Sequence, residues 1–147
     1  MIQLLSAIAI TLFVIVFTRL LSKQVTARLV AATSLCSIAF IYVGFSLKGN
    51  PVSSILLEIL VAIVFYLIAV IGYSKNNLLI AYGISLHGIW DILHHKAAFV
   101  TTDVPAYYPL FCFIVDVLLG VYFFLVFRRP KKTKVVINKP GMSVFDI

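Results

Sequence analysis

Five long apolar runs dominate this 147-residue chain and limit what it can fold into. A helix needs about 20 consecutive apolar residues, with a range of about 17–25, to cross the hydrocarbon core of a bilayer. Because lipid leaves no partner for unpaired backbone polar groups, runs of this length predict helices rather than open strands. The five runs cover residues 2–18, 29–47, 54–73, 78–95 and 108–127.

The composition indicates that lipid is part of the solvent of this fold. The chain is 63% apolar and 12% charged, and its mean hydropathy is +1.13. Soluble domains average about 45–50% apolar and about 25% charged residues. We therefore predict an all-α fold, a polytopic transmembrane bundle of five helices over residues 1–127. A basic, flexible cytoplasmic tail is expected to follow over residues 128–147.

The positions of the lysines and arginines predict an orientation, since cytoplasmic loops carry the excess of both. If the N-terminus is outside, two of the twelve basic residues, Lys48 and Lys96, fall in outer loops. The other ten fall on the cytoplasmic side: Arg19, Lys23, Arg28, Lys75, Arg128, Arg129, Lys131, Lys132, Lys134 and Lys139. We therefore expect a multi-pass protein of the cell membrane with an outer N-terminus and a cytoplasmic C-terminus.

The net charge of +7 does not indicate a nucleic-acid partner, because the basic residues flank apolar runs or lie in the tail. The expected partner is the bilayer, with the tail on anionic lipid, where each basic residue adds about 1 kcal/mol. A tail that only enforces orientation is the open alternative. The first run lacks the positive start of a signal peptide and is expected to be retained. Cys36 and Cys112 lie inside apolar runs and are expected to be buried thiols.

The fourth run carries an unusual set of polar side chains. His87, Asp91 and His94 are spaced i, i+4, i+7, which puts them on one face of a helix. His95 lies at the edge of the same face. Ligands one helical turn apart are a geometry that metal sites exploit. Imidazole and carboxylate are ligands of zinc and iron.

Equal depth extends this set to neighbouring runs. His87 and Asp116 each lie eight residues inside the outer end of their runs, or about 12 Å along a helix. The short connection between the two runs predicts adjacent antiparallel helices, so that His87 and Asp116 should meet. Glu58 lies four residues inside the third run, counted from Ser54 at the outer end of that run. The predicted metal ligands are therefore His87, Asp91, His94, Asp116 and Glu58, with a divalent metal such as zinc as the cofactor. His94 is the alternate ligand or the general base.

Each of these residues also has a structural interpretation. An ionisable side chain inside a membrane costs about 2.5–3.5 kcal/mol on insertion scales, which favours a functional role. Against this, His94 and His95 could lie inert at the interface. His87 and Asp116 could form a hydrogen-bonded pair that holds two helices together. Glu58 could extend to the outer surface.

Two motifs in the second half of the chain carry a family resemblance. The first is the H-x-x-W-D-x-x-H-H motif that begins at His87, and the second is P-x-F-C-x-x-x-D from Pro109 to Asp116. Together they resemble a group of small uncharacterised bacterial integral membrane proteins, over about thirty residues of the chain. The resemblance implies an inner-membrane protein and no assigned activity.

Three functions remain open at this point. The first is a small structural or interaction subunit of the membrane, whose polar pair fixes helix packing. The second is a metal-dependent membrane enzyme that acts on a lipid-like substrate at the outer side. The third is a metal-ion or proton-linked transporter, which at this size would have to form a homo-oligomer. Elemental analysis of the purified protein separates the first from the other two.

Overall fold

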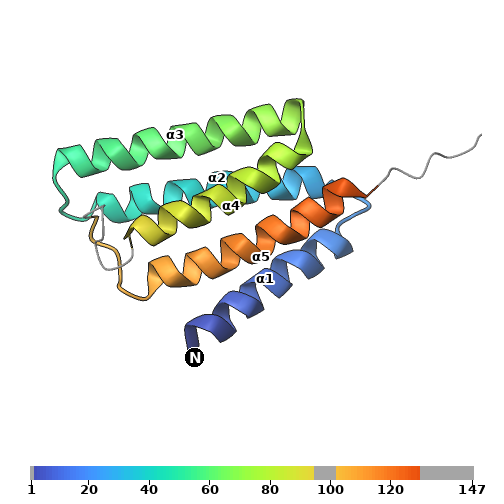
Figure 1. Ribbon diagram of the computed structural model, residues 1–147, viewed down its shortest axis with the longest axis horizontal. Coiled ribbons are helices and arrows are strands. Elements are labelled where there is room, and N and C mark those ends of the chain that lie inside the picture. Colours follow the sequence, from blue (N-terminus) through green and yellow to red (C-terminus); the bar gives the residue numbers. More distant parts are fainter. Residues whose placement is uncertain (1, 95–101, 130–147) are drawn as a thin grey trace, which may run out of the picture.

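The computed structural model describes residues 2–94 and 102–129, and these form five α-helices and no strand (Figure 1). This confirms the predicted all-α bundle of five helices, each of which coincides with one apolar run. His95, Lys96 and the tail from residue 130 onward lie outside the described residues. The helices are α1 (Ile2–Leu20), α2 (Ala27–Ser46), α3 (Val52–Ser74), α4 (Asn77–His94) and α5 (Tyr108–Arg128).

Local side chains explain where the helices begin and turn. The Thr26 hydroxyl caps α2 by accepting a hydrogen bond from the amide of Leu29 at 3.2 Å. Between α2 and α3 the chain turns at Gly49, whose φ of 84° lies in the left-handed region that glycine tolerates best. Pro109 stands in the first turn of α5, where its missing amide is not needed. These tight connections keep successive helices antiparallel.

The helices lie side by side with their long axes roughly aligned (Figure 1). Helix α3 and helix α1 occupy the two flanks, α2 and α4 lie between them, and α5 lies between α4 and α1. The most extensive packing joins α4 to α5 and α2 to α3. We call the end of the bundle that holds the α2–α3 turn and the start of α5 the Asn50 end. The N-terminus of α1 and the C-terminus of α4 lie at this same end.

Four of the helices, α1, α2, α3 and α5, are long and apolar enough to cross a membrane. Helix α4 is the exception, because it carries His87, Asp91 and His94, all of which are buried in the bundle. Its opposite face is apolar and exposed, as at Leu86 and Ile89. The bundle thus turns its apolar side chains outward and its polar groups inward, which suits a lipid environment.

Basic residues are unevenly distributed between the two ends of the described bundle. Lys48 follows α2 at the Asn50 end. The remaining basic residues of the described chain lie in or beside helix termini at the opposite end: Arg19, Lys23, Arg28, Lys75, Arg128 and Arg129. The arrangement therefore keeps the charge asymmetry from which the orientation was predicted, while the orientation itself stays a prediction.

Candidate functional site

His87 and Asp116 are in direct contact in the interior of the bundle. His87 comes from the middle of α4 and Asp116 from α5, and each is only 1% exposed. The Nδ1 atom of His87 lies 2.8 Å from Oδ2 of Asp116, which is hydrogen-bond distance. The prediction that equal depth on adjacent helices brings these two side chains together is confirmed.

Asp91 completes a group of three with them. It lies one turn beyond His87 on α4, and its Oδ1 atom is 3.7 Å from the same Nδ1 of His87. One ligand atom from each of the three residues lies within 4.8 Å of the others. We call His87, Asp91 and Asp116 the His87 triad. The triad draws two carboxylates and one imidazole into a space from which solvent is excluded.

The carboxylates of the triad are only half satisfied by hydrogen bonds. Asp91 accepts at Oδ1 from the hydroxyl of Tyr42, at 2.8 Å. Asp116 is contacted at Oδ2 by His87. The second oxygen of each group, Oδ2 of Asp91 and Oδ1 of Asp116, is buried and has no hydrogen-bond partner among the described residues. A buried carboxylate oxygen without a partner is costly, so each of these two atoms calls for a proton, a hydrogen-bond donor or a cation.

Glu58 and His94 form a separate pair nearer the Asn50 end. His94 Nε2 lies 2.7 Å from Oε1 of Glu58, and its Nδ1 lies 3.1 Å from the carbonyl oxygen of Trp90. The hydroxyl of Thr102 donates a second hydrogen bond to the same Glu58 oxygen, at 2.5 Å. Both ring nitrogens of His94 are therefore engaged within the chain. The five ligands predicted from the sequence divide into a triad and a pair, and the general-base role of His94 stays a prediction.

Tyr42 connects the pair to the triad. Its ring stacks on His94 with 4.2 Å between centroids, and its hydroxyl binds Asp91. At 1% exposure it is one of the most deeply buried large side chains of the described bundle. Sequence reasoning missed both Tyr42 and Thr102. The available signal was weak: a tyrosine inside an apolar run needs a partner for its hydroxyl, but the partner is 49 residues away.

Gly88 of α4 borders the triad on the side of α5. A Cβ atom placed on Gly88 would lie 3.4 Å from Cβ of Asp116 and 3.4 Å from the ring of Phe113. These are ordinary van der Waals distances, so the two helices are in direct contact beside the triad. On the other side, the ring of Phe65 meets the ring of His87 edge-on at 4.9 Å between centroids. The triad is thus enclosed by apolar walls and close helix packing.

The donor set of the triad fits a divalent metal. Zinc takes imidazole nitrogen and carboxylate oxygen at about 2.0–2.2 Å, so tetrahedral ligand atoms stand about 3.3–3.5 Å apart. Nδ1 of His87 lies 2.8 Å from Oδ2 of Asp116 and 3.7 Å from Oδ1 of Asp91, so one distance is shorter and one slightly longer than that separation. Two carboxylates and a neutral imidazole would balance the charge of a divalent ion. The two unpartnered oxygens would supply further coordination.

Comparison with known proteins identifies a family but no activity. No curated protein and no solved structure matches the chain. The model of a family of unknown function, DUF6010, matches residues 2–129, a range that includes every described residue of the bundle. The match agrees with the uncharacterised membership that the sequence motifs implied. This chain belongs to the DUF6010 family.

Proposed function

We propose that this protein is a metal-dependent membrane enzyme whose catalytic centre is the His87 triad. The observation that carries the proposal is the pair of buried carboxylate oxygens, one on Asp91 and one on Asp116, that lack hydrogen-bond partners within residues 2–94 and 102–129. Each stands in a residue whose other oxygen is already bonded. A divalent ion held by both carboxylates and by His87 satisfies the two orphaned oxygens at once.

The number of protein ligands favours catalysis over a purely structural metal. Structural zinc sites are closed by four protein ligands, whereas catalytic sites use three and keep one position for water or substrate. The triad offers three. Metal bound there would polarise an oxygen of the substrate or lower the pKa of a bound water, which are the two common contributions of such ions. The chain itself would hold the ion, exclude bulk water and orient Asp91 through Tyr42.

Four helices of the bundle are apolar enough to cross a membrane, which supports a membrane-resident substrate. The centre lies inside a bundle whose exposed surface is largely aliphatic, so a water-soluble substrate would have to cross lipid to reach it. A lipid-like substrate is already dissolved in that environment. The predicted orientation would make the Asn50 end the outer side, so that the substrate would come from the outer leaflet.

A structural role is the second candidate, and one contact favours it. The hydrogen-bond distance of 2.8 Å between His87 and Asp116 ties α4 to α5, the two helices with the most extensive packing. A proton shared between Asp91 and Asp116 could then satisfy the remaining oxygens without metal. In that case the polar centre would only hold the helices together, and the protein would serve as a small membrane subunit.

Elemental analysis separates the two candidates. Protein purified in mild detergent and washed of loose metal should retain about one divalent ion per chain, which is the content of a mononuclear centre. Asp91→Asn and Asp116→Asn should each abolish retention, since each removes a ligand charge. Asp103→Asn is the matched control, because Asp103 is exposed and lies outside the triad. A folded wild-type protein without metal, even after incubation with zinc, iron or manganese, would sink the enzyme proposal and favour the structural role.

A further inference from the structure

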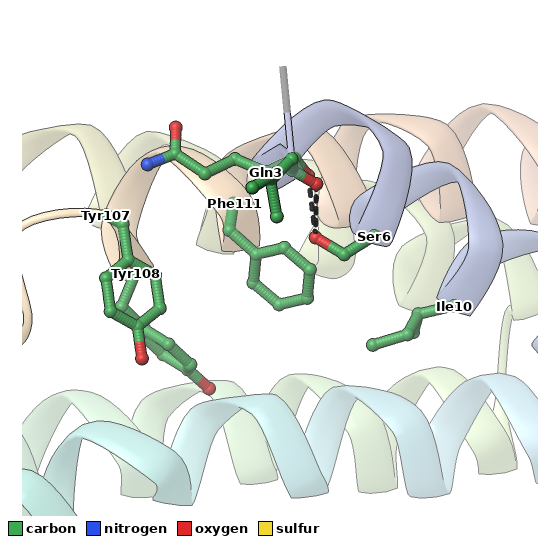
Figure 2. A pocket seen from close by; sticks show the side chains of 7 residues that line it. Gln3, Ser6, Ile10, Tyr107, Tyr108 and Phe111 are labelled. Atoms are coloured by element: carbon green, nitrogen blue, oxygen red, sulfur yellow. Dashed lines mark hydrogen bonds between the residues drawn. The ribbon is translucent and has the colours of Figure 1, made fainter.

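Helix α1 does not close against the bundle at the Asn50 end. A pocket of about 520 Å³ lies between α1 and the start of α5. Figure 2 shows its side chains: Phe111 points into the space, Tyr107 and Tyr108 stand at one end, and Ile10 stands at the other. The remaining lining comes from Ile2, Gln3 and Ser6 of α1.

The pocket continues along α1 into a second hollow. Ile10 lines both. The second hollow, of about 310 Å³, extends to Phe17 on α1 and to Leu119 on α5, and α2 forms its remaining wall with Val30, Thr33, Ser34, Ser37 and Ile38. From Ile2 to Phe17 the groove follows α1 for about 22 Å, at 1.5 Å per residue. Half of the hydrocarbon core of a bilayer is about 15 Å deep. The groove is therefore long enough to follow an acyl chain through one leaflet, and it runs in the same direction.

Polar groups of the first pocket are concentrated at one end. The hydroxyls of Tyr107 and Tyr108 and the amide of Gln3 lie at the Asn50 end, whereas Ile10 and Phe111 provide apolar walls farther in. The Ser6 hydroxyl is already used, because it donates to backbone carbonyl oxygens of its own helix. In the second hollow the hydroxyls come from α2, where Thr33 and Ser37 donate to backbone carbonyl oxygens of their own helix. An occupant that matches this pattern has one apolar chain and one hydrogen-bonding head.

Two aromatic rings connect the pocket to the His87 triad. Tyr108 lines the pocket and packs edge-on against the ring of Tyr42, with 6.3 Å between centroids. Tyr42 in turn donates to Asp91 of the triad. A head group that displaced the Tyr108 ring would stand next to the hydroxyl that orients a proposed metal ligand. The pocket is therefore placed to deliver a substrate to the centre.

We propose that the groove between α1 and α5 binds a single-chain lipid of the bilayer, with its polar head at Tyr107 and Tyr108. We also infer that this lipid is the substrate of the metal centre, which rests on the proposed function.

A tryptophan placed in the pocket tests binding directly. Trp90 is the only tryptophan of the chain, so the double variant Trp90→Phe, Phe111→Trp reports from the pocket alone. A dibrominated fatty acid should quench its fluorescence saturably, and an unbrominated fatty acid should reverse the quenching. Ser6→Phe places a ring in the pocket. It should weaken binding of the dibrominated fatty acid about tenfold or more, since a filled cavity resists insertion. Ser53→Phe, at an exposed position of α3 on the same end, should leave binding unchanged.

The outcomes separate this inference from the proposed function, because the quenching is measured on protein stripped of metal. Quenching that rises without saturation and is not reversed shows general solvation by lipid and overturns the pocket. Emission that depends on the protein-to-lipid ratio but not on fatty acid shows a second copy in the groove, and also overturns it. Saturable binding with the same affinity before and after zinc is reloaded supports the lipid pocket but contradicts the lipid's role as substrate. A substrate bound at the centre and the metal must alter each other's affinity.

Discussion

The hydroxyl of Tyr42 is the only hydrogen-bond donor that reaches Asp91 from another helix among the described residues. Its ring packs on His94, so the side chain is held from both ends. Partners of this kind orient a metal ligand without touching the metal, and their loss usually weakens metal binding about 10–100-fold. Tyr42 is therefore a positioning residue in the proposed centre.

Tyr42→Phe should lower zinc affinity about 10–100-fold while the protein stays folded. The variant removes the hydroxyl and keeps the ring that stacks on His94, so helix packing is preserved. Competition titration with a zinc chelator measures the affinity, and circular dichroism checks the fold. Tyr66→Phe serves as the control, because Tyr66 is exposed on α3 and lies outside the centre. Equal affinities for Tyr42→Phe and wild type would remove Tyr42 from the mechanism.

His87 and Asp116 should show energetic coupling in a double-mutant cycle. His87→Ala and Asp116→Ala each strand a buried partner, so the double variant should lose less stability than the two singles combined. Polar pairs in membrane bundles average about 0.6 kcal/mol of coupling. A metal held by both residues should raise the coupling well above that value, and a chelator should return it toward about 0.6 kcal/mol. Unfolding titrations in mixed micelles give the four free energies.

The matched cycle pairs His87→Ala with Asp103→Ala. Asp103 is exposed and does not belong to the triad, so these two losses should add within about 0.3–0.5 kcal/mol. Additive losses for His87 and Asp116 as well would contradict a shared centre. Strong coupling that a chelator leaves unchanged would support the structural role of the pair instead.

Helices α4 and α5 meet through residues with little or no side chain. A Cβ atom placed on Gly120 of α5 would collide with the hydroxyl of Ser85 on α4 and would lie 3.3 Å from the carbonyl oxygen of Ala81. The Ser85 hydroxyl already donates to that carbonyl, at 3.2 Å. Small residues at such contacts are what allow membrane helices to approach closely. The contact sets the spacing that the triad needs farther along the same two helices.

Gly120→Ala should destabilise the bundle by about 1–3 kcal/mol, because the added methyl overpacks the α4–α5 contact. Gly44→Ala is the matched control, since a Cβ at Gly44 on α2 meets nothing within 4 Å. That change should be neutral or stabilising by up to about 1 kcal/mol, the helix preference for alanine over glycine. Unfolding titrations compare the two variants. Similar effects at both positions would show that close approach at Gly120 is unimportant.

The charge asymmetry between the two ends of the bundle predicts how the molecule lies in the membrane. The end opposite Asn50 holds the basic residues of the described α1–α2 and α3–α4 connections and of the α5 terminus. Reporter fusions after Lys75 and at the C-terminus should therefore read cytoplasmic, and fusions in the Asn50 turn and at Asp103 should read external. An odd number of crossings puts the two termini on opposite sides. A C-terminal fusion that reads external would reject the five-crossing orientation and the outer-leaflet access proposed for the substrate.

Much of the fold was predictable from local pattern because a membrane helix satisfies its own backbone. Each apolar run is long enough to span a bilayer, so helix number and approximate bounds needed no long-range contact. The i, i+4 relation of His87 and Asp91 also follows from helix geometry alone. The meeting of His87 with Asp116 could be predicted because one short connection joins their helices and equalises their depth.

Other features depended on contacts between helices that are distant in the chain. Helical rotation about each axis decides which side chains face one another, and apolar runs as uniform as α2 and α3 carry little information about that rotation. Hence Tyr42 beside Asp91, 49 residues away, and Thr102 beside Glu58, 44 residues away, came only from the tertiary structure. The same packing decided that Glu58 and His94 pair with each other, since a carboxylate and an imidazole bind whichever partner the surrounding helices bring within reach.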